Sequence, residues 1–234
     1  MRITAIVPSA GKSRRMKSAV EKPYLLLGDK PVLAHTLMAL ERSSFVQEVI
    51  LLVRRARIPL AKKLVRRFGL RKITGIYAGG TNRFESVWQG LQRVSPDSHF
   101  VLVHDGARPL VSEALIQKVV RAAFRYGAAV PVLPVNSTVK QGKGRFVTKT
   151  VDRRELWEVQ TPQVFRRSLL VAGYLKGKKE GVPTTDCAAL VERLGKKVCM
   201  VPGEPQNLKI TTKEELAFSD VLLNGKRKTP CAWE

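Results

Sequence analysis

The sequence is short of cysteine, acidic residues, aromatic residues and long apolar runs. Its three cysteines, Cys187, Cys199 and Cys231, have neither C-x-x-C spacing nor an accompanying histidine cluster. They argue against a zinc site or a disulfide framework and fit a reducing compartment. No apolar run approaches the ~20 residues of a membrane-spanning helix, and the N-terminus enters a strand-like segment almost at once. We expect no membrane span, no signal peptide, and a location in the cytoplasm, or in the plastid stroma if the source bears plastids.

Acidic residues are scarce relative to basic ones. The chain has 42 Lys and Arg against 19 Asp and Glu, a formal net charge of +23. A field of this sign attracts polyanions. However, the cations lie in short dispersed clusters, and the aromatic residues, 6% of the chain, do not alternate with them. We therefore interpret the charge as a solvated surface and expect no specific nucleic-acid partner and no membrane partner.

Hydrophobic segments alternate between strand-like and helical patterns through most of the chain. Strand patterns occupy residues 2–8, 48–53, 73–77, 100–104, 129–135 and 197–201. Helical patterns begin at Pro31 and at Thr212 and also span residues 58–68, 83–94, 112–126, 168–177 and 185–194. This order predicts an α/β fold with a mostly parallel, Rossmann-like open sheet covered by helices on both faces.

Residues 136–159 interrupt this alternation. Two strand patterns, 138–140 and 145–151, flank Gly142-Lys143-Gly144, which predicts a projecting β-hairpin. A two-stranded ribbon is only marginally stable alone, so we expect this arm to pack on the second subunit of a homodimer. The chain then forms one domain over residues 1–223, with the arm inserted at 136–159 and a basic tail at 224–234.

The first strand leads into a loop of small and basic residues, Ser9-Ala10-Gly11-Lys12-Ser13-Arg14-Arg15-Met16. Small side chains let backbone N–H groups approach a phosphate, and the cations neutralise it. Ile6 stands where a Walker A loop needs glycine, and one glycine is too few for a Rossmann dinucleotide loop. What remains has the form of a nucleotidyltransferase signature.

Polar residues follow the ends of other predicted strands too. They are Gly79, Gly80, Arg83 and Ser86 after one strand, Asp105, Gly106 and Arg108 after the next, and Thr138 after a third. Ligands of open α/β sheets bind at the C-terminal ends of the strands, so we expect these groups to meet. A strand-end carboxylate beside an arginine suits Mg²⁺ next to a bound phosphate, which favours Asp105 as a metal ligand over a structural Asp–Arg pair. His104 should point away from Asp105, so we interpret it as structural.

Short motifs occur in order over residues 3–223. They are Pro8-Ser9-Ala10-Gly11-x-x-Arg14-Arg15-Met16, Lys22-Pro23-Tyr24, Gly79-Gly80-x-x-Arg83-x-x-Ser86-Val87, His104-Asp105-Gly106-Ala107-Arg108-Pro109, Thr150-Val151-Asp152-Arg153, Thr161-Pro162-Gln163, Thr185-Asp186 and Asn207-Leu208-Lys209-Ile210-Thr211. Each motif is weak alone, but the ordered set is specific. It resembles the 2-C-methyl-D-erythritol 4-phosphate cytidylyltransferase family of the non-mevalonate isoprenoid pathway.

The resemblance implies an enzyme that converts CTP and 2-C-methyl-D-erythritol 4-phosphate to 4-diphosphocytidyl-2-C-methyl-D-erythritol and pyrophosphate, with Mg²⁺ or another divalent cation held by Asp105. The implied catalytic residues are Arg15, Lys22, Asp105 and Lys209. The implied CTP contacts are Ala10, Gly11, Gly79, Gly80, Ser86 and Gly106. The implied sugar-phosphate contacts are Arg108, Thr138, Arg153, Thr161 and Lys209, those on the arm coming from the partner subunit. Thr185 and Asp186 match a motif to which no role is assigned.

The chain departs from the family pattern at three points. Thr81-Asn82 replaces an acidic residue that often follows the glycines, and Gly106 replaces the usual alanine. The lysine loop reads Glu21-Lys22-Pro23-Tyr24, whereas the family usually has a residue between a proline-lysine pair and the tyrosine. These differences bear on nucleotide contacts and leave the reaction class unchanged.

Two other functions compete with this interpretation. A ribitol-5-phosphate cytidylyltransferase shares the loop, the Asp105 motif and the arm, but Ala107 and the Lys209 motif favour methylerythritol phosphate. A basic nucleic-acid-binding module requires clustered basic and aromatic residues, which this chain lacks.

Overall fold

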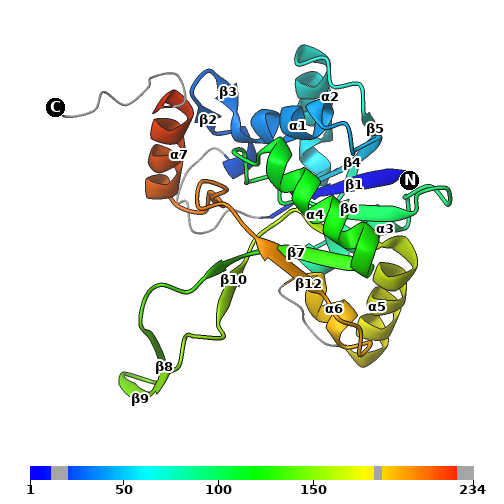
Figure 1. The fold of residues 1–234 in the computed structure, drawn as a ribbon. Coiled ribbons are helices and arrows are strands. Elements are labelled where there is room, and N and C mark those ends of the chain that lie inside the picture. The colour runs from blue at the N-terminus through cyan, green and yellow to red at the C-terminus, as the bar shows by residue number, and fades with distance from the viewer. Residues whose placement is uncertain (12–20, 182–185, 226–234) are drawn as a thin grey trace.

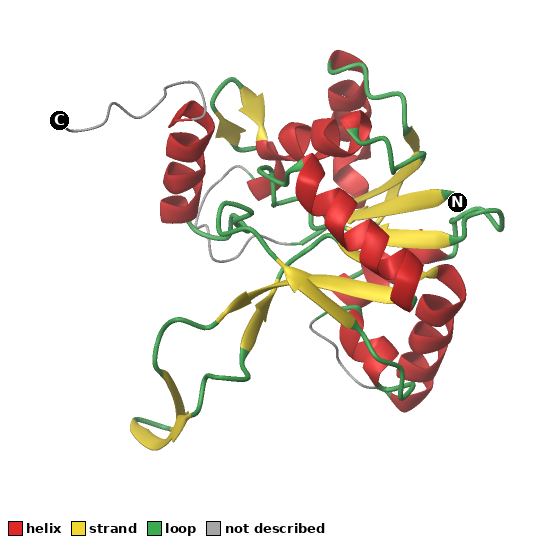
Figure 2. Ribbon diagram, viewed as in Figure 1, coloured by secondary structure: helices red, strands yellow, loops and turns green. Residues whose placement is uncertain are grey.

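The computed structural model describes residues 1–11, 21–181 and 186–225. A central eight-stranded sheet has the order β10-β7-β11-β6-β1-β4-β5, and β12 also pairs with β7 (Figure 1, Figure 2). The strands are β1 (Ile3–Pro8), β4 (Glu48–Val53), β5 (Ile73–Ala78), β6 (Phe100–Val103), β7 (Ala128–Pro134), β10 (Trp157–Val159), β11 (Gln163–Arg166) and β12 (Cys199–Pro202).

The sheet is mostly parallel, as the alternation of strands and helices predicts. β1 pairs in parallel with β4 and β6, β4 with β5, and β7 with β12. β10 and β11 are antiparallel to their neighbours and were not predicted. They have only three and four residues, too few for a hydrophobic period to be recognised.

Helices cover both faces of the sheet. One face carries α1 (Val32–Arg42), α2 (Ile58–Arg67) and α4 (Glu113–Tyr126), and the other carries α3 (Arg83–Leu91), α5 (Arg167–Glu180) and α6 (Ala188–Glu192). Along β1, Ala5 and Val7 face the first group whereas Ile6 faces the second. Burial on both faces explains the continuous apolar runs of these strands. Within the described residues, no helix combines the length and apolar character needed to cross a bilayer.

The predicted helix boundaries follow local capping chemistry. The Ser112 hydroxyl accepts a hydrogen bond from the Leu115 N–H at the start of α4, and Gly127 ends that helix with a φ of 85°. α7 (Lys213–Gly225) starts with the predicted capping box, because Glu215 N–H donates to the Thr212 hydroxyl and the Glu215 carboxylate accepts from Thr212 N–H.

α7 belongs to a small satellite core beside the main sheet. Leu216, Leu222 and Leu223 pack around buried Leu27 and Ile210. Leu27 lies in β2 (Leu26–Leu27), which forms an unpredicted two-residue ladder with β3 (Lys30–Pro31). The Ile210 N–H donates to the Ala107 carbonyl at 2.9 Å, so this core fixes the Lys209 segment against the loop that follows β6.

The predicted hairpin is present and projects from the body of the molecule (Figure 1). β8 (Val139–Lys143) and β9 (Phe146–Val151) form a separate two-stranded sheet, and Gly144 at its tip has a φ of 60°. Phe146 and Val147 are 79% and 64% exposed. The arm was expected to span 136–159, but residues 157–159 are β10 and extend the main sheet by pairing with the end of β7.

Candidate active site

The C-terminal ends of β1, β5 and β6 open onto a pocket of about 280 Å³. Its lining comes from the loops after these strands, the start of α3, the lysine loop and the Lys209 segment. The lining residues are Pro8, Ser9, Ala10, Gly11, Lys22, Pro23, Gly80, Thr81, Asn82, Arg83, Ser86, Asp105, Gly106, Ala107 and Lys209. The strands therefore bring together most of the residues expected to meet.

Other candidates lie away from this lining. Gly79 is not part of the lining but packs against it, since a Cβ atom there would come within 2.6 Å of the Ala10 Cβ. Thr138 and Arg153 are exposed on the arm, and the Arg153 guanidinium donates to the Asn136 carbonyl. Arg15, like Thr185, falls outside the described residues.

Gly106 allows two loops of the pocket to touch. A Cβ atom at this position would lie 1.9 Å from the Ser9 Oγ. An alanine here would therefore require the Ser9 side chain to turn or the loop after β1 to move away from the loop after β6. Glycine lets the Ser9 hydroxyl keep its present position between the two loops.

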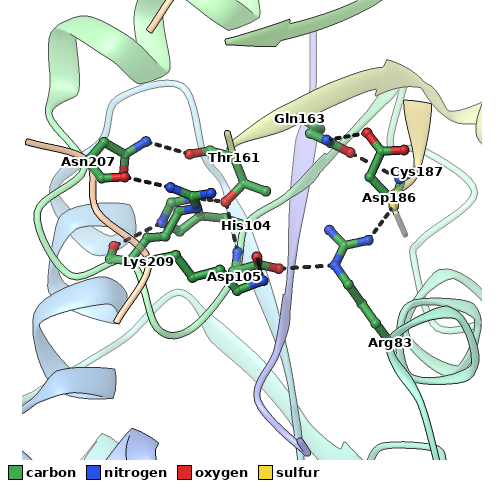
Figure 3. A network of polar contacts seen from close by, with 10 residues as sticks. Arg83, His104, Asp105, Thr161, Gln163, Asp186, Cys187, Asn207 and Lys209 are labelled. Carbon is green, nitrogen blue, oxygen red and sulfur yellow. Dashed lines mark hydrogen bonds and ion pairs between the residues drawn. The ribbon is translucent and has the colours of Figure 1, made fainter. Parts of the chain in front are cut away.

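Asp105 is held between two cations. Its Oδ1 accepts from Arg83 Nε at 3.1 Å, and its Oδ2 accepts from Lys209 Nζ at 2.7 Å (Figure 3). Burial alone would raise the pKa of the carboxyl, but the charges of Arg83 and Lys209 outweigh burial and hold the pKa well below its usual value. At neutral pH the group is a carboxylate and cannot supply a proton.

A ring of hydrogen bonds supports Asp105 from behind (Figure 3). The Thr161 hydroxyl accepts from the Asp105 N–H at 3.1 Å and contacts His104 Nδ1 at 3.0 Å. His104 Nε2 lies 3.2 Å from the Arg108 carbonyl, so this nitrogen carries the proton and Nδ1 accepts from Thr161. Arg108 Nη1 donates to the Asn207 carbonyl at 2.6 Å, and Asn207 Nδ2 donates back to the Thr161 carbonyl at 2.8 Å.

This ring ties the loop after β6 to the segment that carries Lys209. His104 is fully buried, and burial lowers the pKa of its imidazole to about 4. Arg108 and Thr161, expected to approach a substrate, are 8% and 4% exposed and do not line the pocket. Asn207 was recognised only as part of a motif, because its contacts join segments far apart in the sequence.

The chain matches one family over nearly its whole length. The family profile that matches residues 3–225 is described as 2-C-methyl-D-erythritol 4-phosphate cytidylyltransferase. A relative of that name from Geobacillus kaustophilus is 40% identical over 226 residues, 97% of this chain and 99% of the relative. Another from Pelotomaculum thermopropionicum is 40% identical over 97% of this chain and 96% of its own length.

Solved structures that resemble this chain have the same enzyme activity in their names. The 4-diphosphocytidyl-2C-methyl-D-erythritol synthase from Anaerococcus prevotii superposes with a TM-score of 0.84 at 33% identity, covering 95% of this chain and 96% of that one. The 2-C-methyl-D-erythritol 4-phosphate cytidylyltransferase from Thermus thermophilus gives 0.80 at 33% identity, with 96% and 100% covered. The chain belongs to the 2-C-methyl-D-erythritol 4-phosphate cytidylyltransferase family.

One departure from this family's pattern has a structural counterpart. Thr81 and Asn82 stand where an acidic residue often follows the glycines, but the Glu85 carboxylate lies beside them. It accepts from the Thr81 N–H at 2.7 Å, the Thr81 hydroxyl at 2.8 Å and the Asn82 side chain at 3.1 Å. An acidic group from α3 therefore fixes this part of the pocket rim.

The site's donor set suits a metal that also takes ligands from a substrate. In the described parts of the chain, no group of three or more His, Cys, Asp and Glu side chains could hold a metal ion. Mg²⁺ commonly uses one or two protein carboxylates together with phosphates and water. Asp105 lies at the pocket, and each of its oxygens contacts one cationic side chain. Because a carboxylate has about four acceptor positions, it retains capacity for such an ion.

Proposed function

We propose that this chain transfers the cytidylyl group of CTP to 2-C-methyl-D-erythritol 4-phosphate, giving 4-diphosphocytidyl-2-C-methyl-D-erythritol and pyrophosphate. The observation that carries the proposal is the ionised Asp105 held between Arg83 and Lys209 at the strand ends. The pocket belongs to a chain that matches this family over residues 3–225.

The reaction needs no general base from the protein. An oxygen of the sugar phosphate, already anionic at neutral pH, attacks the α-phosphorus of CTP. The bond from that phosphorus to the bridging oxygen breaks, and the electron pair leaves on pyrophosphate. Asp105 is ionised, and the free nitrogen of His104 is occupied by the Thr161 hydroxyl. We infer that the site works by positioning two polyanions and stabilising developing charge.

The expected site residues divide between the two substrates. We assign the CTP phosphates to Lys22 and Arg15, and the nucleoside to the small residues Ala10, Gly11, Gly79, Gly80, Ser86 and Gly106. We assign the sugar phosphate to Lys209, whose Nζ reaches Asp105 at the pocket. Arg108 and Thr161 support Lys209 and Asp105 through the hydrogen-bond ring.

We assign the metal to Asp105. Bound there, Mg²⁺ or another divalent cation would neutralise part of the triphosphate charge. The protein's own contribution is to keep the carboxylate ionised and fixed, through Arg83, Lys209 and the Asp105 N–H bond to Thr161.

We infer that the active enzyme is a homodimer in which the arm supplies Thr138 and Arg153 to the partner's pocket. Neither residue lines the pocket of its own chain, and the arm exposes Phe146 and Val147. We also expect a cytoplasmic location and no specific nucleic-acid or membrane partner.

Phosphorus NMR of the reaction mixture tests the function. With CTP, Mg²⁺ and methylerythritol phosphate, the sugar phosphate signal should disappear as a diphosphate diester and free pyrophosphate form together. Free pyrophosphate without the diester would indicate hydrolysis of CTP and contradict the proposal. Ribitol 5-phosphate is the competing acceptor, and the relatives' names favour methylerythritol phosphate over it.

A further inference from the structure

Two buried residues and one half-buried residue behind the pocket form a bracket around Arg83. We propose that this bracket, made of Gln163, Asp186 and Cys187, positions the Arg83 guanidinium and through it the Asp105 carboxylate (Figure 3). The inference rests on the proposed function, because it concerns the same site. It gives a role to Asp186, which the sequence motif left without one.

Arg83 is held at two of its nitrogens. Nε donates to Asp105 Oδ1 at 3.1 Å, and Nη1 donates to Cys187 Sγ at 3.3 Å. A planar guanidinium bonded at one nitrogen can still pivot about that contact, whereas two contacts fix its orientation. The sulfur therefore determines how Arg83 approaches Asp105.

Cys187 is itself fixed by the two neighbouring members of the bracket. Its N–H donates to Gln163 Oε1 at 3.1 Å, and Gln163 Nε2 donates to Asp186 Oδ2 at 3.0 Å. The other Asp186 oxygen accepts from the Ala189 N–H at 3.1 Å. The oxygen and the nitrogen of the buried Gln163 amide thus both bind the chain just before α6.

The bracket and Asp105 are anchored on the same pair of strands. Gln163 lies opposite Val103 in the β11–β6 ladder, and Asp105 follows Val103 by two residues. The distance between Gln163 and Asp105 is therefore set by the sheet. Contacts run from Gln163 to Cys187, from Cys187 to Arg83 and from Arg83 to Asp105. The pairing of β11 with β6 joins the two ends of this series and makes it a closed loop.

A packing role is the alternative for Cys187. Its side chain is fully buried, and its sulfur lies 3.5 Å from the Tyr174 hydroxyl oxygen. The Tyr174 ring in turn stacks on the Phe84 ring, with 4.7 Å between the ring centroids. If Cys187 only packs, its substitution should lower activity by the same factor whether or not Arg83 is present. If Cys187 positions Arg83, its substitution should matter little once Arg83 has been replaced.

A double-mutant cycle separates these roles. Cys187→Ala should lower kcat about tenfold and change the KM for CTP less than about twofold, because the charges of the pocket remain. In an Arg83→Lys background, the same change should alter kcat less than about twofold. Cys187→Ser, whose hydroxyl can still accept from Arg83, should keep most of the activity. Equal losses from Cys187→Ala in both backgrounds would overturn the proposal.

Cys199→Ala is the matched control. Cys199 lies on β12 and contacts the Met200 carbonyl at 3.7 Å, so this substitution should leave kcat unchanged. A loss equal to that of Cys187→Ala would show that any cysteine-to-alanine change impairs the enzyme and would also contradict the bracket.

A second measurement is independent of turnover. The Arg83 Nε–H, bonded to Asp105, should give a slowly exchanging signal in ¹H–¹⁵N spectra, assigned by its loss in Arg83→Lys. Cys187→Ala should broaden or abolish this signal, and Cys199→Ala should retain it. An unchanged signal in Cys187→Ala would refute the bracket. Wild-type protein that shows the signal but no cytidylyl transfer would refute the proposed function alone.

Discussion

Thr161→Val removes one hydroxyl from the ring behind Asp105 while keeping the side chain's shape. The Asp105 N–H loses its acceptor at 3.1 Å, and His104 Nδ1 loses its donor at 3.0 Å. Asp105 and His104 are 6% and 0% exposed, so water does not readily replace either bond. A buried polar group left without a partner costs ~1–3 kcal/mol. The two together should lower the free energy of unfolding by ~2–6 kcal/mol.

The same substitution should also slow the reaction. Without its backbone anchor, the Asp105 carboxylate shifts relative to Lys209, and we expect kcat to fall about tenfold. Urea unfolding followed by tryptophan fluorescence measures the stability, and pyrophosphate release measures the rate. A higher KM for the sugar phosphate with unchanged kcat would instead mean that the hydroxyl contacts the substrate.

Thr4→Val provides the control for this prediction. Thr4 is fully buried on β1, and its hydroxyl lies 2.6 Å from the Ser98 hydroxyl, outside the pocket lining. This variant should lose stability and keep the wild-type kcat. Wild-type stability in Thr161→Val, or an equal loss of kcat in both variants, would refute the reasoning.

Three further predictions concern charge, pH and the arm. Asp105→Asn should nearly abolish turnover while circular dichroism shows a folded protein, and wild-type rates at saturating Mg²⁺ would make Asp105 a structural residue only. Burial lowers the pKa of His104 from 6.5 to about 4, so the folded state takes up this proton at lower pH than the unfolded state. The free energy of unfolding, measured with a chelator, should therefore fall by ~3 kcal/mol between pH 6.5 and 4. His104→Asn should flatten this part of the profile, and an unchanged slope would disprove the assignment. Arg153→Lys should raise the KM for the sugar phosphate more than that for CTP, because lysine cannot form bidentate bonds to phosphate. Heterodimers of Arg153→Ala and Asp105→Asn subunits should recover activity, since one of their two sites carries neither defect; no recovery would exclude a shared site.

Much of the fold follows from local features of the sequence. Apolar runs set β4 at Glu48–Val53, and Ser112 and Gly127 set the ends of α4. β11 could not be found this way, because its place between β6 and β7 depends on pairing with segments distant in the sequence.

The sequence predicts the residues that line the pocket, but it does not predict the hydrogen bonds that hold Asp105 from behind. Parallel strands bring their C-terminal ends together, which places Gly80, Asp105 and Gly106 at one pocket. The contact between Thr161 and His104 joins residues 57 positions apart and depends on the register of β11 against β6. Side-chain periodicity does not encode that register, so the buried position of the Thr161 hydroxyl could only come from the structure.

The most direct test of the central claim is the initial rate of pyrophosphate release with CTP and each of two acceptors. We predict Mg²⁺-dependent release of pyrophosphate with 2-C-methyl-D-erythritol 4-phosphate, a much lower kcat/KM with ribitol 5-phosphate, and no release without an acceptor. A higher kcat/KM with ribitol 5-phosphate, or release that needs no acceptor, would contradict it.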